Sequence, residues 1–81
     1  MDKNKVYIVN KFIDVCGKIS FKTCKVSNSY AVAKHCFEMN VNRAKFKHRL
    51  FSDDWVKDDY FYYDSGELTK IIIELKEYYL E

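Results

Sequence analysis

The chain has 81 residues, of which 17% are aromatic and 32% charged, and its formal net charge is +2 at pH 7. This length allows one domain spanning residues 1–81, because so short a chain hides only about 60–65% of the surface that it exposes when unfolded. It leaves little room for an enclosed active site, and the longest apolar run is too short to cross a bilayer.

The three cysteines, without a secretory signal pattern, favour free thiols in a reducing compartment. We therefore expect a cytoplasmic location.

The net charge hides a division between the two parts of the chain. Residues 1–50 carry eleven Lys and Arg against three Asp and Glu, a net +8, whereas residues 51–81 carry three against nine, a net −6. Such asymmetry indicates a charged partner, unless the two parts lie against each other and neutralise themselves.

The first third of the chain predicts a β-hairpin. Lys5–Asp14 carries apolar residues on both faces, which is typical of a strand that is central or covered on both sides. Gly17 supplies the positive φ of a tight turn, and Ile19–Val26 returns with a bulge near Thr23 that restores its register.

The segment from Ser29 to Leu50 predicts a long helix. Ser29 is a good N-cap, and apolar residues recur at helical spacing after it. Asn40 and Asn42 are poor in helix interiors, so we expect either one helix or a break into two near Met39.

The last third predicts a loop followed by a second hairpin. Residues 51–58 show no clear period, Tyr60–Tyr63 has strand composition, and Asp64-Ser65-Gly66 fits a three-residue hairpin loop. Leu68–Leu75 then forms the last strand, although its spacing also fits a helix. The expected fold is a single small α+β domain of ββαββ order: an antiparallel sheet with one long, continuous or broken, helix across one face.

Catalytic motifs are absent from the sequence. The cysteines and histidines do not have the two-to-four-residue spacing of structural zinc sites, and no glycine-rich phosphate loop is present. We expect no enzymatic activity, no metal and no cofactor.

A basic cluster near the end of the predicted helix suggests contact with nucleic acid or with an acidic partner. Its candidate residues are Lys34, Arg43, Lys45, Lys47 and Arg49. The lysines of the first hairpin extend this patch: Lys11, Lys18, Lys22 and Lys25.

An acidic and aromatic cluster follows, and it favours protein binding. Aromatic side chains bring large contact area at low entropic cost, and neighbouring carboxylates can pair with a basic partner. The candidate residues are Asp53, Asp54, Trp55, Asp58, Asp59, Tyr60 and Tyr62.

In size and layout the chain resembles the small inhibitors of host defence that phages and mobile elements encode, including anti-CRISPR proteins. The resemblance spans the whole chain: the hairpin of Val6–Val26, the helix from Ser29, the segment Tyr60–Leu75, and a composition rich in Lys, Asn and Ile. It implies stoichiometric, non-enzymatic inhibition of a larger host protein or effector complex, which we expect to handle nucleic acid, and a location in the cytoplasm of the host if the chain is encoded by a phage. Nucleic-acid binding by the basic patch is the alternative function, and a homodimer is a further expectation because a small sheet leaves edges uncovered.

Overall fold

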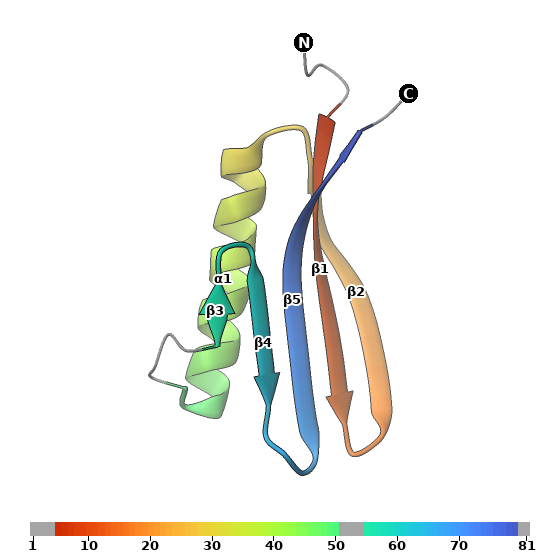
Figure 1. The fold of residues 1–81 in the computed structure, drawn as a ribbon, viewed down its shortest axis with the longest axis vertical. Coiled ribbons are helices and arrows are strands. Elements are labelled where there is room, and N and C mark those ends of the chain that lie inside the picture. Colours follow the sequence, from red (N-terminus) through yellow and green to blue (C-terminus); the bar gives the residue numbers. More distant parts are fainter. Residues whose placement is uncertain (1–4, 51–54, 80–81) are drawn as a thin grey trace.

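The computed structural model describes residues 5–50 and 55–79, which form one five-stranded antiparallel sheet and one helix. The strands lie in the order β2-β1-β5-β4-β3 (Figure 1). The elements are β1 (Lys5–Val15), β2 (Lys18–Ser27), α1 (Tyr30–His48), β3 (Val56–Lys57), β4 (Tyr60–Asp64) and β5 (Thr69–Tyr79). The predicted α+β class is confirmed. In the described part of the chain, no helix is both long and apolar enough to span a membrane.

The pairing of β1 with β5 forms the spine of the sheet. It runs without interruption from Lys5 opposite Tyr79 to Val15 opposite Thr69. Both hairpin turns therefore lie at one end of the molecule, where the helix also ends (Figure 1). The Cys16 N–H donates to the Leu68 carbonyl at 2.8 Å and joins the two turns.

The first hairpin has the predicted tight turn and the predicted bulge. Cys16 and Gly17 both have positive φ, 55° and 84°, as a two-residue type I′ turn requires. Val9 pairs with Lys25 but Asn10 with Thr23, so Cys24 is the extra residue on β2. The bulge turns the Cys24 side chain toward the core.

The second hairpin is also confirmed, with a longer loop than expected. Gly66 has the predicted positive φ of 84°, but four residues, 65–68, separate the strands. The Ser65 hydroxyl accepts backbone N–H groups from Glu67, Leu68 and Thr69, which stabilises this wider loop. The last segment is a strand rather than a helix, and it extends to Tyr79.

The helix is continuous, so of the two alternatives that the sequence left open, one helix or a break near Met39, the first is correct. The Ser29 hydroxyl caps the helix by accepting the Val32 N–H at 3.3 Å. Asn40 is buried, and its Nδ2 donates to the Cys36 carbonyl at 2.8 Å. The Asn40 side chain, which would disfavour a helix in isolation, thus bonds to a backbone carbonyl one turn earlier in α1. Burial in the core therefore overrides the low helix propensity of asparagine.

The core lies between α1 and one face of the sheet. Its buried apolar residues are Val9, Ala33, Phe37, Val41, Phe61, Ile71, Ile73 and Leu75. The core residues of β5 alternate, at Ile71, Ile73 and Leu75, as expected for a sheet with one covered face, and β1 and β4 contribute Val9 and Phe61. β1 is central, as predicted, but only one of its faces is covered in the described part of the molecule. The two-residue strand β3 lies in a segment that was expected to be a loop.

Candidate functional site

The face of the sheet that points away from α1 carries a row of apolar side chains across four strands. The pairings place Phe21 opposite Phe12, Phe12 opposite Ile72, and Ile72 opposite Tyr62. We call these four residues the aromatic row. Phe21 is 64% exposed and Tyr62 is 37% exposed. These side chains are large and apolar, and no described element covers them.

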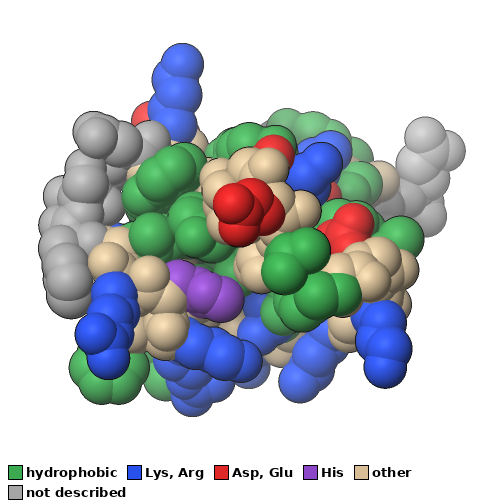
Figure 2. Space-filling view, turned by 90° about the horizontal axis from the view of Figure 1, so that it is seen from below, with side chains coloured by type: hydrophobic (Ala, Val, Ile, Leu, Met, Phe, Trp, Pro, Cys, Tyr) green, Lys and Arg blue, Asp and Glu red, His purple; other side chains and the backbone are tan. Residues whose placement is uncertain are grey.

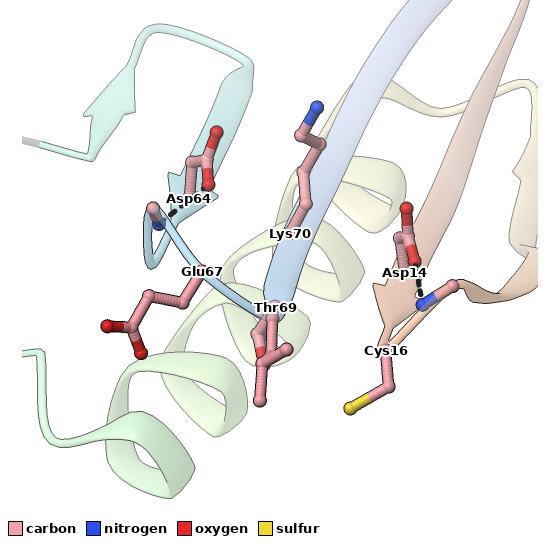
Figure 3. Close-up of a pocket in the computed structure, with 9 residues that line it drawn as sticks. Asp14, Cys16, Asp64, Glu67, Thr69 and Lys70 are labelled. Atoms are coloured by element: carbon pink, nitrogen blue, oxygen red, sulfur yellow. Dashed lines mark hydrogen bonds between the residues drawn. The ribbon is translucent and has the colours of Figure 1, made fainter.

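Polar rows border the aromatic row on both sides. Toward the termini, the cross-strand neighbours are Thr23, Asn10, Glu74 and Tyr60. The Thr23 hydroxyl donates to Asn10 Oδ1 at 2.9 Å. Toward the hairpin turns, Lys70 is opposite both Asp14 and Asp64, and Figure 3 shows its side chain between the two carboxylates.

The hairpin turns enclose an open hollow of about 480 Å³, whose lining includes Asp14, Cys16, Asp64, Glu67 and Lys70 (Figure 3). Two of its carboxylates, those of Asp14 and Asp64, accept hydrogen bonds from nearby backbone N–H groups. Asp14 accepts the Gly17 N–H at 3.1 Å, and Asp64 accepts the Gly66 N–H at 2.9 Å. Within residues 5–50 and 55–79, no group of three or more His, Cys, Asp or Glu side chains is arranged to hold a metal ion.

Hydrogen bonds at this hollow shift the pKa values of Asp64 and Tyr62. The Gly66 N–H and the Tyr62 hydroxyl, which donates at 3.1 Å, lower the pKa of Asp64 because both favour the charged carboxylate. The same hydrogen bond raises the pKa of Tyr62, because the phenol must keep its proton to donate it. Asp64 is therefore an ionised structural acceptor at neutral pH.

The predicted acidic and aromatic cluster is divided by the fold. Tyr60 and Tyr62 lie on the open face of the sheet, beside or within the aromatic row. Trp55 packs edge-to-face on Tyr63, with ring centroids 5.1 Å apart, and lies half-buried against the core. Asp53 and Asp54 lie outside the described residues.

The two remaining acids of that cluster lie beside the helix. Asp59 accepts hydrogen bonds from Lys34 Nζ at 2.6 Å and from the Tyr30 hydroxyl at 2.9 Å. The Asp58 carbonyl also accepts from Lys34, at 3.2 Å. We call Tyr30, Lys34 and Asp59 the clasp, because they join the start of α1 to the turn between β3 and β4.

The clasp shifts two protonation equilibria in the same direction. The hydrogen bond to Asp59 raises the pKa of Lys34, because the carboxylate favours the ammonium form. It raises the pKa of Tyr30, because the carboxylate accepts the phenolic proton and opposes a phenolate. One lysine of the predicted basic cluster is thus neutralised within the fold.

The other basic residues of that cluster lie on different sides of α1. Lys34 and Lys45 line a hollow next to Val56 and Asp58, on the side of β3. Arg43 and Lys47 line hollows on the side of β1 and β2. Arg49 ends the helix with a left-handed backbone, φ 57° and ψ 44°.

Arg43 and Lys47 meet the lysines of the first hairpin in what we call the cationic groove, which runs between α1 and the β1–β2 hairpin. It consists of two adjoining hollows of about 360 and 400 Å³ that share Asn40 and Arg43. Its basic residues are Lys11, Lys22, Lys25, His35, Arg43, Lys47 and His48. Among the described residues, no Asp or Glu lines either hollow. Seen from the end with the turns, Lys and Arg side chains form a row from the α1 side to the β2 side, and the acidic side chains lie away from it (Figure 2).

The groove places like charges close together. Lys11 and Lys22 are directly opposite each other on β1 and β2, and Arg43 and Lys47 are four residues apart on α1. Each such pair destabilises a fold by about 0.2–1 kcal/mol. No described acidic partner offsets this repulsion.

The sequence indicated part of each surface. It identified Tyr60, Tyr62, Arg43, Lys47 and the hairpin lysines, but it did not identify the aromatic row as a surface. The available signal was the second apolar face of β1, which includes Phe12. The apolar residues on both faces of Lys5–Asp14 predicted a strand that is central or covered on both sides. Comparison with models of known protein families, with curated proteins and with solved structures finds no match for this chain.

Proposed function

We propose that this chain is a small binding domain that attaches to a larger protein through the open face of its sheet and masks the surface that it covers. The observation that supports this function best is the aromatic row, with Phe21 and Tyr62 exposed at its two ends. Contiguous apolar side chains on a small domain are typical of a contact site.

The arrangement of the open face matches the anatomy of protein interfaces. Apolar and aromatic residues fill its centre, and polar residues such as Asn10, Glu74 and Lys70 border it. Three strands of about ten residues and the five-residue β4, spaced by about 4.8 Å, give a face of roughly 550 Å² in projection. A standard interface buries about 800 Å² on each partner, so this face alone supplies most of one.

The partner class that we propose is a nucleic-acid-handling protein or effector complex, on the basis of the resemblance to small inhibitors of host defence. Inhibition by occupancy requires only a stable complex of fixed stoichiometry. In this proposal the acidic residues contribute less than the sequence suggests, because Asp59 is occupied by Lys34 and Tyr30.

A capture experiment with substituted proteins tests the open face. Phe21→Lys combined with Tyr62→Lys places charge at both ends of the aromatic row, and we expect it to abolish capture of the partner from a lysate of the source or host cell. Phe46→Lys is the matched control, because Phe46 is 85% exposed but lies on α1. Circular dichroism must show that all variants remain folded.

Two outcomes contradict the proposal. The first is capture that survives in the double variant, and the second is capture that Phe46→Lys abolishes equally. Sedimentation velocity tests whether a second copy of the chain, rather than a larger protein, covers the open face. A wild-type dimer and a monomeric double variant would show that it does.

Direct nucleic-acid binding by the basic residues of α1 remains the alternative proposal. It has less support, because Lys34 is bound to Asp59 and because Lys45 lies on the other side of the helix from Arg43 and Lys47. A titration with a labelled duplex and a single strand tests it. Binding that falls steeply with salt and is lost in Arg43→Glu combined with Lys47→Glu favours the alternative.

A further inference from the structure

We propose that the hollow between the C-terminal half of α1 and the sheet is a binding site for a small anionic amphiphile, a molecule with an apolar body and a carboxylate or phosphate head. The hollow has a volume of about 400 Å³ and is the part of the cationic groove nearest the hairpin turns. This volume lies within the usual range of small-molecule sites.

The floor of the hollow is apolar. Ile13 and Val15 of β1, Ile71 of β5 and Ala44 of α1 line it. Ile71 is buried, whereas Val15 is exposed, so the apolar floor opens toward the surface at the end of β1. An apolar body placed here removes its own surface and that of Val15 from water, which favours binding.

The rim of the hollow is cationic. Lys11, Arg43, Lys47 and His48 line it, and no acidic residue does so in the described part of the chain. Three of these side chains, Lys11, Arg43 and Lys47, make no ion pair or hydrogen bond with any other described residue. An anionic head bound at this rim would gain several charge-assisted hydrogen bonds.

Stabilisation of the helix dipole accounts for only some of the basic side chains at this rim. Lys47 and His48 lie in the last turn of α1, where cations favour the negative end of the helix dipole. Lys11 is on β1 and Arg43 lies more than one turn before the helix end, so that effect does not account for them. Lys11 also lies opposite Lys22, which raises the energy of the unliganded state. A bound anion relieves this repulsion.

The lining favours a small molecule over a nucleic acid. Proteins that bind single strands stack bases on aromatic side chains beside a cationic track. Among residues 5–50 and 55–79, no Phe, Tyr or Trp lines this hollow. The one described ring in the lining is the His48 imidazole, which already packs on Tyr63 with 5.5 Å between ring centroids. The site lies on the helix side of the sheet, so it is independent of the open face and of the function proposed for it.

Calorimetric titration of the full chain with decanoate, below its micelle concentration, tests the site. Decanol supplies the apolar body without the charge, inorganic phosphate supplies the charge without the body, and decyl phosphate exchanges the head group. We expect decanoate or decyl phosphate to bind at least about tenfold more tightly than decanol or phosphate, since one charge-assisted contact is worth about that factor. Amide NMR shifts should be centred on Lys11, Ala44 and Lys47.

Matched variants separate the site from general charge effects. Lys11→Gln combined with Arg43→Gln should weaken decanoate binding by about tenfold or more. Lys18→Gln combined with Lys57→Gln removes the same charge outside the hollow and should leave the affinity within about threefold. Val15→Trp keeps every cation but fills the mouth of the hollow, and it should also weaken binding.

Three results overturn the proposal. Decanol binding as tightly as decanoate removes the role of the cations. Shifts centred on Phe21 and Tyr62 place the ligand on the open face instead. An oligonucleotide that binds the same residues more tightly than decanoate, and displaces it, assigns the groove to nucleic acid.

Discussion

At the scale of single residues, the clasp is one contact at which the positive and negative parts of the chain meet, and the ion pair of Lys5 with Glu77 at 3.2 Å is another. Lys34 comes from the basic part and Asp59 from the acidic part, and the pair is about two-thirds shielded from solvent. Tyr30 adds a second hydrogen bond to the same carboxylate. One acid therefore orients two side chains of the first turns of α1 and holds the helix to the β3–β4 turn.

Replacing the Asp59 carboxylate of the clasp should lower the free energy of unfolding by a small but measurable amount. We expect Asp59→Asn to lower the free energy of unfolding by about 1 kcal/mol, the upper end for partly exposed ion pairs. Urea unfolding at pH 7 measures the change, and Asp58→Asn is the control, because Asp58 contributes a backbone carbonyl to Lys34 rather than its carboxylate.

The clasp should also give the stability of the protein a dependence on alkaline pH. The folded-state pKa values of Lys34 and Tyr30 lie above their ordinary values, so folding favours their protonated forms. This stabilisation is complete below about pH 10 and is lost as the pH rises through the shifted pKa values. The stability gap between wild type and Asp59→Asn should be constant from about pH 7 to 9 and should shrink above about pH 10. A gap that stays constant to about pH 11 contradicts this assignment.

At the scale of elements, α1 shows how burial overrides local preference. Asn40 and Asn42 have the same low helix propensity, yet Asn40 is 8% exposed and hydrogen-bonded whereas Asn42 is exposed. Cys24 Sγ also lies 3.8 Å from Asn40 Oδ1, so the amide connects α1 to β2. The two asparagines therefore have different roles in one continuous helix.

The same substitution at these two positions should have effects of opposite sign. Asn42→Ala should raise the free energy of unfolding by about 0.5 kcal/mol, because alanine is the better helix former. Asn40→Ala should lower it by about 1 kcal/mol, because the loss of buried hydrogen bonds and of packing outweighs the gain in propensity. Urea unfolding measures both changes. Equal effects at the two positions would contradict the structural role of Asn40.

The β1–β2 pair offers a test of charge repulsion in the groove. Lys22→Glu places an acid opposite Lys11 and should raise the free energy of unfolding by about 0.5 kcal/mol at low salt. The gain should shrink at about 0.5 M NaCl, where exposed charges are screened. Lys18→Glu makes the same charge change opposite Val15 and should give a smaller gain, so an equal gain would indicate a general effect of net charge.

At the scale of the whole molecule, the sheet separates two surfaces of different chemistry. One face carries the aromatic row, and the other carries the helix and the cationic groove. Both hairpin turns and the end of α1 lie at one end, so both surfaces extend to that end (Figure 1). The two surfaces face away from each other and can be occupied at the same time.

This separation predicts that the two surfaces act independently. Lys11→Gln combined with Arg43→Gln should leave partner capture unchanged, and Phe21→Lys combined with Tyr62→Lys should leave decanoate affinity within about threefold of wild type. Capture and calorimetry on the same three proteins, the wild type and the two double variants, measure both effects. Coupled losses would show that one partner contacts both surfaces.

The local sequence determined the turns and the helix cap. Gly17 and Gly66 specified their turns because positive φ is easy only for glycine, and Ser29 specified the helix start because its hydroxyl caps the first turn. The alternation of Ile71, Ile73 and Leu75 favoured a strand with one buried face, although the spacing of the segment also fitted a helix, and pairing with β1 and β4 decided between the two. The turns and the cap depend on neighbours a few residues away, which a sequence displays directly.

Only the tertiary structure decided which faces are covered and which charges meet. The apolar residues Phe12 and Phe21 are compatible with a buried face or an open one, and the choice depends on where the single helix packs. Asn40 became helical because the fold buried and bonded it, and Lys34 left the basic cluster because Asp59, 25 residues away, reached it. Such outcomes depend on pairings between distant segments, whose register and packing no local pattern contains.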